Sequence, residues 1–125
     1  MSGRMSRQKG KRGERQCAAE MNALLGAGVN ARRGVQFKGG NDSPDVSIDA
    51  AIHIEAKRVE ALQLYPALEQ ATRDAPAGKT PVVWHCRNRQ ESVLIVHTKN
   101  ALDFARALID AHERARWESG NEKPN

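Results

Sequence analysis

Apolar and polar side chains alternate along residues 45–58, with the period of two that β-strands require. The aliphatic positions are Val46, Ile48, Ile52 and Ile54. If the chain reverses at Ala50, these four side chains share one face, with Val46 opposite Ile54 and Asp45 opposite Glu55. The pattern therefore predicts a hairpin of strands 45–49 and 52–58, with one face packed on a core.

Three other segments have apolar residues at the spacing of amphipathic helices. The predicted helices run from about residue 13 to 25, 62 to 75 and 101 to 116. Their apolar positions are Cys17, Met21, Leu24 and Leu25; Leu62, Leu64, Tyr65, Leu68 and Ala71; and Leu102, Phe104, Ala105, Leu108 and Ile109. Asn100 is positioned to cap the third helix. Its apolar residues could serve either the core or an interface between subunits.

Further strands are predicted at residues 29–35, 81–85 and 92–97. The order of elements, α-β-β-β-α-β-β-α, indicates an α/β fold with a central mixed sheet of about five strands flanked by helices. The helix between the third and fourth strands allows these two strands to pair in parallel. We expect the acidic hairpin near the edge or switch region of the sheet. Trp84 and Tyr65 are expected to pack between sheet and helices.

The composition of the chain favours binding to polyanions. The chain has 125 residues and a formal charge of +5, enough for one domain, which we assign to residues 11–117. We expect residues 1–10 to form a flexible basic arm and residues 118–125 a frayed tail. The first fifteen residues hold a basic cluster that could bind nucleic acid or simply be solvated. Its members are Arg4, Arg7, Lys9, Lys11, Arg12 and Arg15.

Two further expectations concern location and cysteine chemistry. No apolar stretch in the sequence is long enough to cross a bilayer and no secretory segment is evident, so we expect a cytoplasmic protein. Cys17 and Cys86 lack the spacing of a zinc site and are expected to be reduced, with Cys17 at a contact between helix and core.

The polar face of the hairpin carries the residues best suited to metal binding or catalysis. In the predicted register Asp45, Glu55 and Lys57 lie on one side of the sheet. Two adjacent carboxylates repel each other unless a cation lies between them, and Mg²⁺ or Mn²⁺ prefers such oxygen ligands. The alternative is an ordinary hairpin whose charged face meets solvent. His53 is expected to be a half-exposed strand residue, with a role as proton carrier as the alternative.

At these residues the chain resembles the PD-(D/E)XK nuclease superfamily, and in particular the small Holliday-junction-resolvase-like endonucleases of archaea, phages and prophages. The matching segments are Gly13-Glu14-Arg15, Ser43-Pro44-Asp45, residues 52–58 (Ile-His-Ile-Glu-Ala-Lys-Arg), Leu68-Glu69-Gln70-Ala71, and residues 81–89. The resemblance implies a restriction-endonuclease-like core and a Mg²⁺- or Mn²⁺-dependent endonuclease that cuts branched DNA as a homodimer. It also implies a phage or prophage protein that acts in the host cytoplasm.

The resemblance implies a role for each matching position. Asp45 and Glu55 would be catalytic metal ligands, joined by Glu14 and the carbonyl of Ala56. Lys57 would orient the attacking water or stabilise the phosphorus centre, and Gln70 would shape the site. Taken alone, Glu14 could be an ordinary first-turn glutamate and Gln70 a solvent-facing helix residue.

Basic residues around these positions are candidate DNA contacts, with solvated surface charge as the alternative. They are Lys9, Lys11, Arg12, Arg15, Arg32, Arg33, Lys38, Arg58, Arg87 and Arg89. Two other functions remain open: a nuclease of the same fold that nicks or trims other DNA, and a DNA-binding protein without catalysis.

Overall fold

A mixed five-stranded sheet forms the centre of the protein, which is described by a computed structural model over residues 3–34 and 44–118. The strands lie in the order β1-β2-β3-β4-β5, and all neighbours pair antiparallel except β3 and β4, which are parallel. Their bounds are Arg32–Arg33, Val46–Ser47, Ile52–Arg58, Thr80–Cys86 and Val93–Ile95. The predicted α/β class and the parallel pairing of the third and fourth strands are confirmed.

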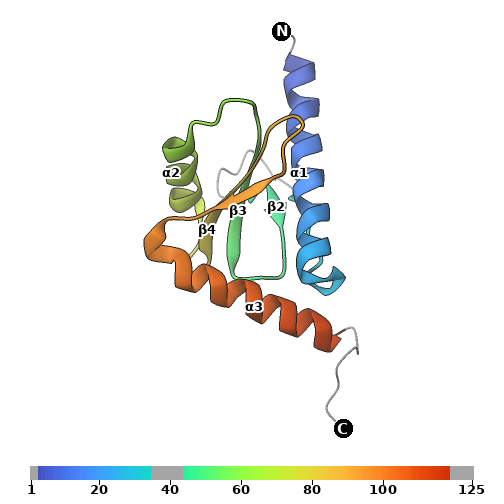
Figure 1. Cartoon of the computed structure of the whole chain (residues 1–125), viewed down its shortest axis with the longest axis vertical. Coiled ribbons are helices and arrows are strands. Elements are labelled where there is room, and N and C mark those ends of the chain that lie inside the picture. Colours follow the sequence, from blue (N-terminus) through green and yellow to red (C-terminus); the bar gives the residue numbers. More distant parts are fainter. Residues whose placement is uncertain (1–2, 35–43, 119–125) are drawn as a thin grey trace.

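Helices cover both faces of this sheet (Figure 1). Helices α1 (Gly3–Leu25) and α3 (Ala101–Glu118) pack with the larger apolar cluster on one face. Helix α2 (Leu64–Asp74) packs on the other face, where Ala67, Leu68 and Ala71 contact a smaller cluster that includes Val83. The strands at the centre of the sheet are therefore buried on both sides.

The predicted hairpin register is confirmed. Val46 pairs with Ile54, and both lie with Ile48 and Ile52 in the cluster under α1 and α3. The hairpin is not near the edge, however, because β3 is the third of five strands. It lies where the pairing changes from antiparallel to parallel, and α2 makes the connection from β3 to β4.

Two N-terminal boundaries differ from the prediction. Helix α1 begins at Gly3, so residues expected in a flexible arm are helical. The strand predicted at 29–35 is reduced to the two residues of β1, because Val29 ends a 3₁₀ turn (Ala27–Val29) and Asn30 has a positive φ of 50°. Such left-handed backbone does not belong to an extended strand. Val35, at the predicted end, lies outside the described residues.

Helix α3 packs through small side chains. It follows a 3₁₀ turn (Thr98–Asn100), and its buried residues are Ala107, Ala111 and Ala115. A Cβ atom added to Gly28 would lie 3.0 Å from the Cβ of Ala115, so the helix approaches the chain after α1 very closely. The larger apolar residues of this helix were predicted to form its buried face, and only some of them do. Phe104 and Leu108 are partly buried, whereas Leu102 and Ile109 are exposed.

A partly buried polar connection joins α1 to β4 and to the residue before β5. The indole N–H of Trp84 donates to Glu20 at 3.0 Å, and the same carboxylate accepts hydrogen bonds from Ser92 and Gln16. Burial alone would raise the pKa of Glu20, but these hydrogen bonds outweigh it and lower the pKa. Trp84 thus packs in the core as predicted. Tyr65 does not, because it lies in the first turn of α2 and is 71% exposed.

Helix α1 also approaches the end of β3 closely. A Cβ atom built on Gly13 would lie 2.8 Å from the Cβ of Arg58, closer than two such atoms can come.

Farther along α1, Cys17 is buried and free, as is Cys86 on β4. Burial first, and then the charges of Glu20 and Asp45, raise the pKa of the Cys17 thiol, which makes it a core residue rather than a reactive one.

Within the described residues, none of the helices combines the length and apolarity needed to span a membrane.

Candidate active site

Two carboxylates meet where the β2–β3 hairpin crosses the middle of the sheet. Asp45 directly precedes β2, and its N–H donates to the carbonyl of Ile54 at 3.2 Å. Its Oδ2 atom accepts the N–H of Ala56 at 3.0 Å, so the side chain is held against β3. Glu55 projects from β3 and is only 2% exposed. The predicted register therefore brings these two acids together.

The surroundings of Asp45 raise the pKa of its carboxyl group. Burial raises the pKa of Asp45 to about 7, and the neighbouring Glu55 and the more distant Glu14 add to the increase. The hydrogen bond from Ala56 acts in the opposite direction but is too weak to offset them. Near neutral pH Asp45 is therefore partly protonated, and a bound cation could take the place of that proton.

His53 completes a buried group beside this pair. Its Nε2 atom lies 3.3 Å from Oε1 of Glu55, and His53 is 1% exposed. The prediction of a half-exposed histidine is wrong because helices cover both faces of the sheet and β3 is central. The sequence contained a signal for this: a strand joined to its parallel neighbour through a helix is normally buried on both faces.

Lys57 follows on the same face of β3, two residues beyond Glu55. Its Nζ atom donates to Oε1 of Gln70 on α2 at 3.3 Å. Both residues line a pocket of about 270 Å³ between the end of β3 and α2. The structure thus joins these two predicted site residues in one partly buried hydrogen-bonded pair beside this pocket.

Glu14 approaches from α1 and is the third acid near Asp45. Its Oε2 atom forms an ion pair with Nε of Arg33 on β1 at 2.9 Å, so Arg33 has an acidic partner. The Glu14 side chain is partly exposed, in contrast to Glu55. Ala56, predicted to contribute its carbonyl, contacts the site through its N–H in this structure.

Some of the candidate DNA contacts are exposed, whereas others form hydrogen bonds within the protein. Arg58 forms such bonds, because its guanidinium donates to Gln16 at 2.6 Å and to Asn88 at 3.4 Å. Arg32 is exposed but donates to the carbonyl of Asn30 at 3.0 Å. Arg33 on β1, which is paired with Glu14, is exposed as well. The remaining exposed members are Lys11, Arg12 and Arg15 on α1 and Arg87 and Arg89 in the connection from β4 to β5. The side chain of Lys9 and all of Lys38 lie outside the described residues.

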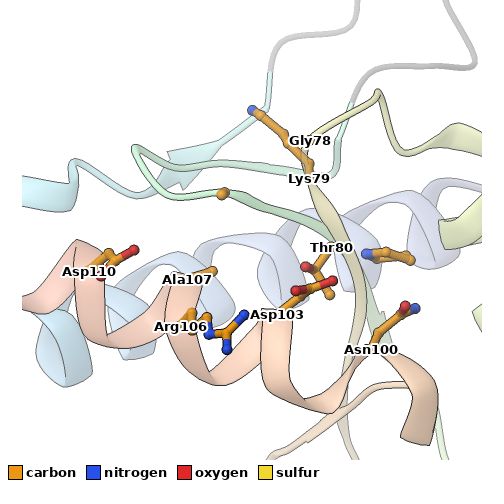
Figure 2. A pocket seen from close by; sticks show the side chains of 10 residues that line it. Gly78, Lys79, Thr80, Asn100, Asp103, Arg106, Ala107 and Asp110 are labelled. Atoms are coloured by element: carbon orange, nitrogen blue, oxygen red, sulfur yellow. The ribbon is translucent and has the colours of Figure 1, made fainter.

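Another pocket, of about 420 Å³, lies between α3 and the start of β4 (Figure 2). Charged side chains of both signs line it, among them Lys79, Asp103, Arg106 and Asp110. None of its lining residues belongs to the predicted site. The acidic pair at Asp45 and Glu55 is therefore separate from this larger hollow.

The acidic pair suits a hard divalent cation, although it does not form a complete cage. Within residues 3–34 and 44–118, no three His, Cys, Asp or Glu side chains are grouped to hold a metal ion. Mg²⁺ is usually held by one or two carboxylates and keeps several waters. The neighbouring carboxylates of Asp45 and Glu55 meet that requirement, and the raised pKa of Asp45 indicates that positive charge is favoured beside them.

Comparison with known protein families, with characterised proteins and with solved structures found no match to this chain.

Proposed function

We propose that this protein is a metal-dependent DNA endonuclease with a restriction-endonuclease-like core, which hydrolyses phosphodiester bonds in branched DNA. The observation that carries the proposal is the pairing of the partly buried Asp45 with the buried Glu55. Burial, and then the charge of Glu55, raises the pKa of Asp45 to about 7, and Lys57 follows Glu55 on the same face of β3. Placing two carboxylates together in a protein interior is costly unless a cation is part of the site. The resemblance to resolvase-like nucleases supports the choice of substrate and a homodimer with two sites.

Asp45 and Glu55 would hold Mg²⁺ or Mn²⁺, which would supply an activated water and offset the negative charge of the transition state. His53 would hold Glu55 in place through its Nε2 contact. Lys57 would present its ammonium to the phosphate, with Gln70 fixing its direction. Exposed arginines and lysines on α1 and after β4 would bind the DNA backbone without reading bases.

A cleavage assay tests the proposal directly. The purified protein would be incubated with a labelled four-way junction or a linear duplex of matched sequence, with Mg²⁺ or with EDTA. We expect cleavage of the junction only with the metal, and none by Asp45→Asn. The matched control is Asp49→Asn, an exposed aspartate at the turn of the same hairpin, which should cleave as the wild type does.

Equal rates on junction and duplex would instead favour a general nicking or trimming nuclease. A third function, DNA binding without catalysis, is favoured by one observation: with its pKa raised to about 7, Asp45 can be neutral beside Glu55, so the pair does not require a metal. Tight junction binding that is unaffected by EDTA, with no strand breaks under any metal, would support this function and refute the nuclease.

A further inference from the structure

The outer face of α3 has an unusual sequence of exposed side chains. Leu102, Ile109 and Trp117 are 71%, 57% and 51% exposed. With Arg106 and Glu113, which are also exposed, they follow at intervals of three and four residues and so form one stripe along the helix. The stripe lies opposite the alanines that face the core, Ala107, Ala111 and Ala115. We call these five residues the α3 stripe.

The α3 stripe is complementary to itself. Leu102 and Trp117 lie at equal distances from the point midway between residues 109 and 110, and so do Arg106 and Glu113. If a second copy of α3 lay antiparallel with a two-fold axis at that point, each Arg106 would meet Glu113 of the other copy. Each Leu102 would meet Trp117, and the two Ile109 side chains would meet at the axis. Symmetric dimers require this kind of self-matching surface.

The two charges are available for such a contact. Within the described part of the chain, neither the Arg106 nor the Glu113 side chain forms an ion pair or hydrogen bond. Arg106 borders the pocket with Asp103 and Asp110, but no ion pair with either is formed. A partner that brings an opposite charge to each position would therefore satisfy groups that the single chain leaves in solvent.

From these observations we infer that the α3 stripe binds a second copy of this chain, antiparallel, as a two-fold symmetric dimer. In Figure 1, α3 crosses one end of the molecule while the N-terminus of α1 lies at the other. The dimer would leave the basic residues of α1 and the acidic pair uncovered. This inference names the surface that joins two copies, and it rests on α3 alone rather than on the proposed cleavage.

The contact should be modest in strength. Eighteen residues of helix span about 27 Å at about 1.5 Å per residue, and small interfaces of this kind are usually transient. We expect a dissociation constant on the order of micromolar or weaker. Sedimentation velocity over a concentration series reaching hundreds of micromolar, in EDTA and without DNA, would measure it independently of any nuclease activity.

Exchanging the charges of Arg106 and Glu113 tests this particular pairing. Arg106→Glu alone and Glu113→Arg alone each place like charges across the axis and should weaken the dimer about tenfold. The double variant restores opposite charges and should return to within about threefold of the wild type. Ile109→Glu should abolish the dimer, whereas Arg73→Glu, an exposed reversal on α2, should have no effect. Thermal unfolding would verify that each variant folds.

Two results would overturn the inference. The first is a wild-type protein that is monomeric across the whole series. The second is a double variant as weak as the single ones, which would show that Arg106 and Glu113 do not face each other across the axis.

Discussion

Asp45→Asn tests the energetics of the acidic pair without any knowledge of the substrate. The ordinary pKa of an aspartate, 3.8, is raised to about 7 in the folded protein. Between these values the folded state retains a proton that the unfolded chain has lost, so stability falls as pH rises through this window. About 3 pKa units at about 1.4 kcal/mol each give an upper limit of about 4 kcal/mol.

Asparagine removes the titrating group but keeps an oxygen that can accept the N–H of Ala56, as Oδ2 does now. We therefore expect the variant to gain up to about 3 kcal/mol relative to the wild type between pH 4.5 and pH 8 in metal-free buffer. Urea unfolding followed by circular dichroism at several pH values measures this difference. The Asp49→Asn variant, altered at an exposed site, should follow the wild type.

Adding Mn²⁺ at pH 8 extends the test to the cation. A ligand at a hundred times its dissociation constant stabilises the folded state by about 2.7 kcal/mol, so the wild type should regain much of what it lost. Asp45→Asn should gain little. If the wild type and Asp45→Asn have the same pH dependence, folding does not raise the pKa of Asp45 and the reasoning behind the site fails.

Three further substitutions examine single contacts. Lys57→Met should reduce cleavage about 10²–10³-fold while leaving junction binding nearly unchanged; equal losses in both would show that Lys57 only binds DNA. His53→Ala should weaken Mn²⁺ affinity about tenfold by freeing Glu55, and His53→Gln should restore part of it; calorimetric titration that finds no change in affinity would contradict this. Glu20→Gln should cost about 1 kcal/mol in urea unfolding, since the bond from Trp84 keeps an acceptor but loses its charge; a loss below about 0.5 kcal/mol would refute that assignment.

The hairpin register was predictable because four aliphatic residues agree on one face and a slip of one residue would expose all of them. Val46 accordingly pairs with Ile54. The same pattern could not reveal that the opposite face is buried as well, since this depends on how α2 packs after β3. For that reason His53 and Glu55, polar in sequence, are nearly inaccessible in the structure.

The contribution of α3 was harder to predict because hydrophobicity and burial disagree there. Its largest apolar residues include Leu102 and Ile109, which are exposed, while alanines face the core. The cause lies far away in sequence, where Gly28 allows Ala115 to approach closely. Periodicity identifies a helix from local residues alone, but which side faces inward is decided by the space that other elements leave.

Gly13 has a consequence for the ion that the site would select. Because only a residue without a side chain fits against Arg58 at this point, α1 comes near enough for the charge of Glu14 to act on Asp45. A bulkier residue would push the helix outward and widen the gap between these carboxylates. Under the proposed function, the discrimination between a small ion such as Mg²⁺ and a larger one such as Ca²⁺ would depend in part on this glycine, which itself binds nothing.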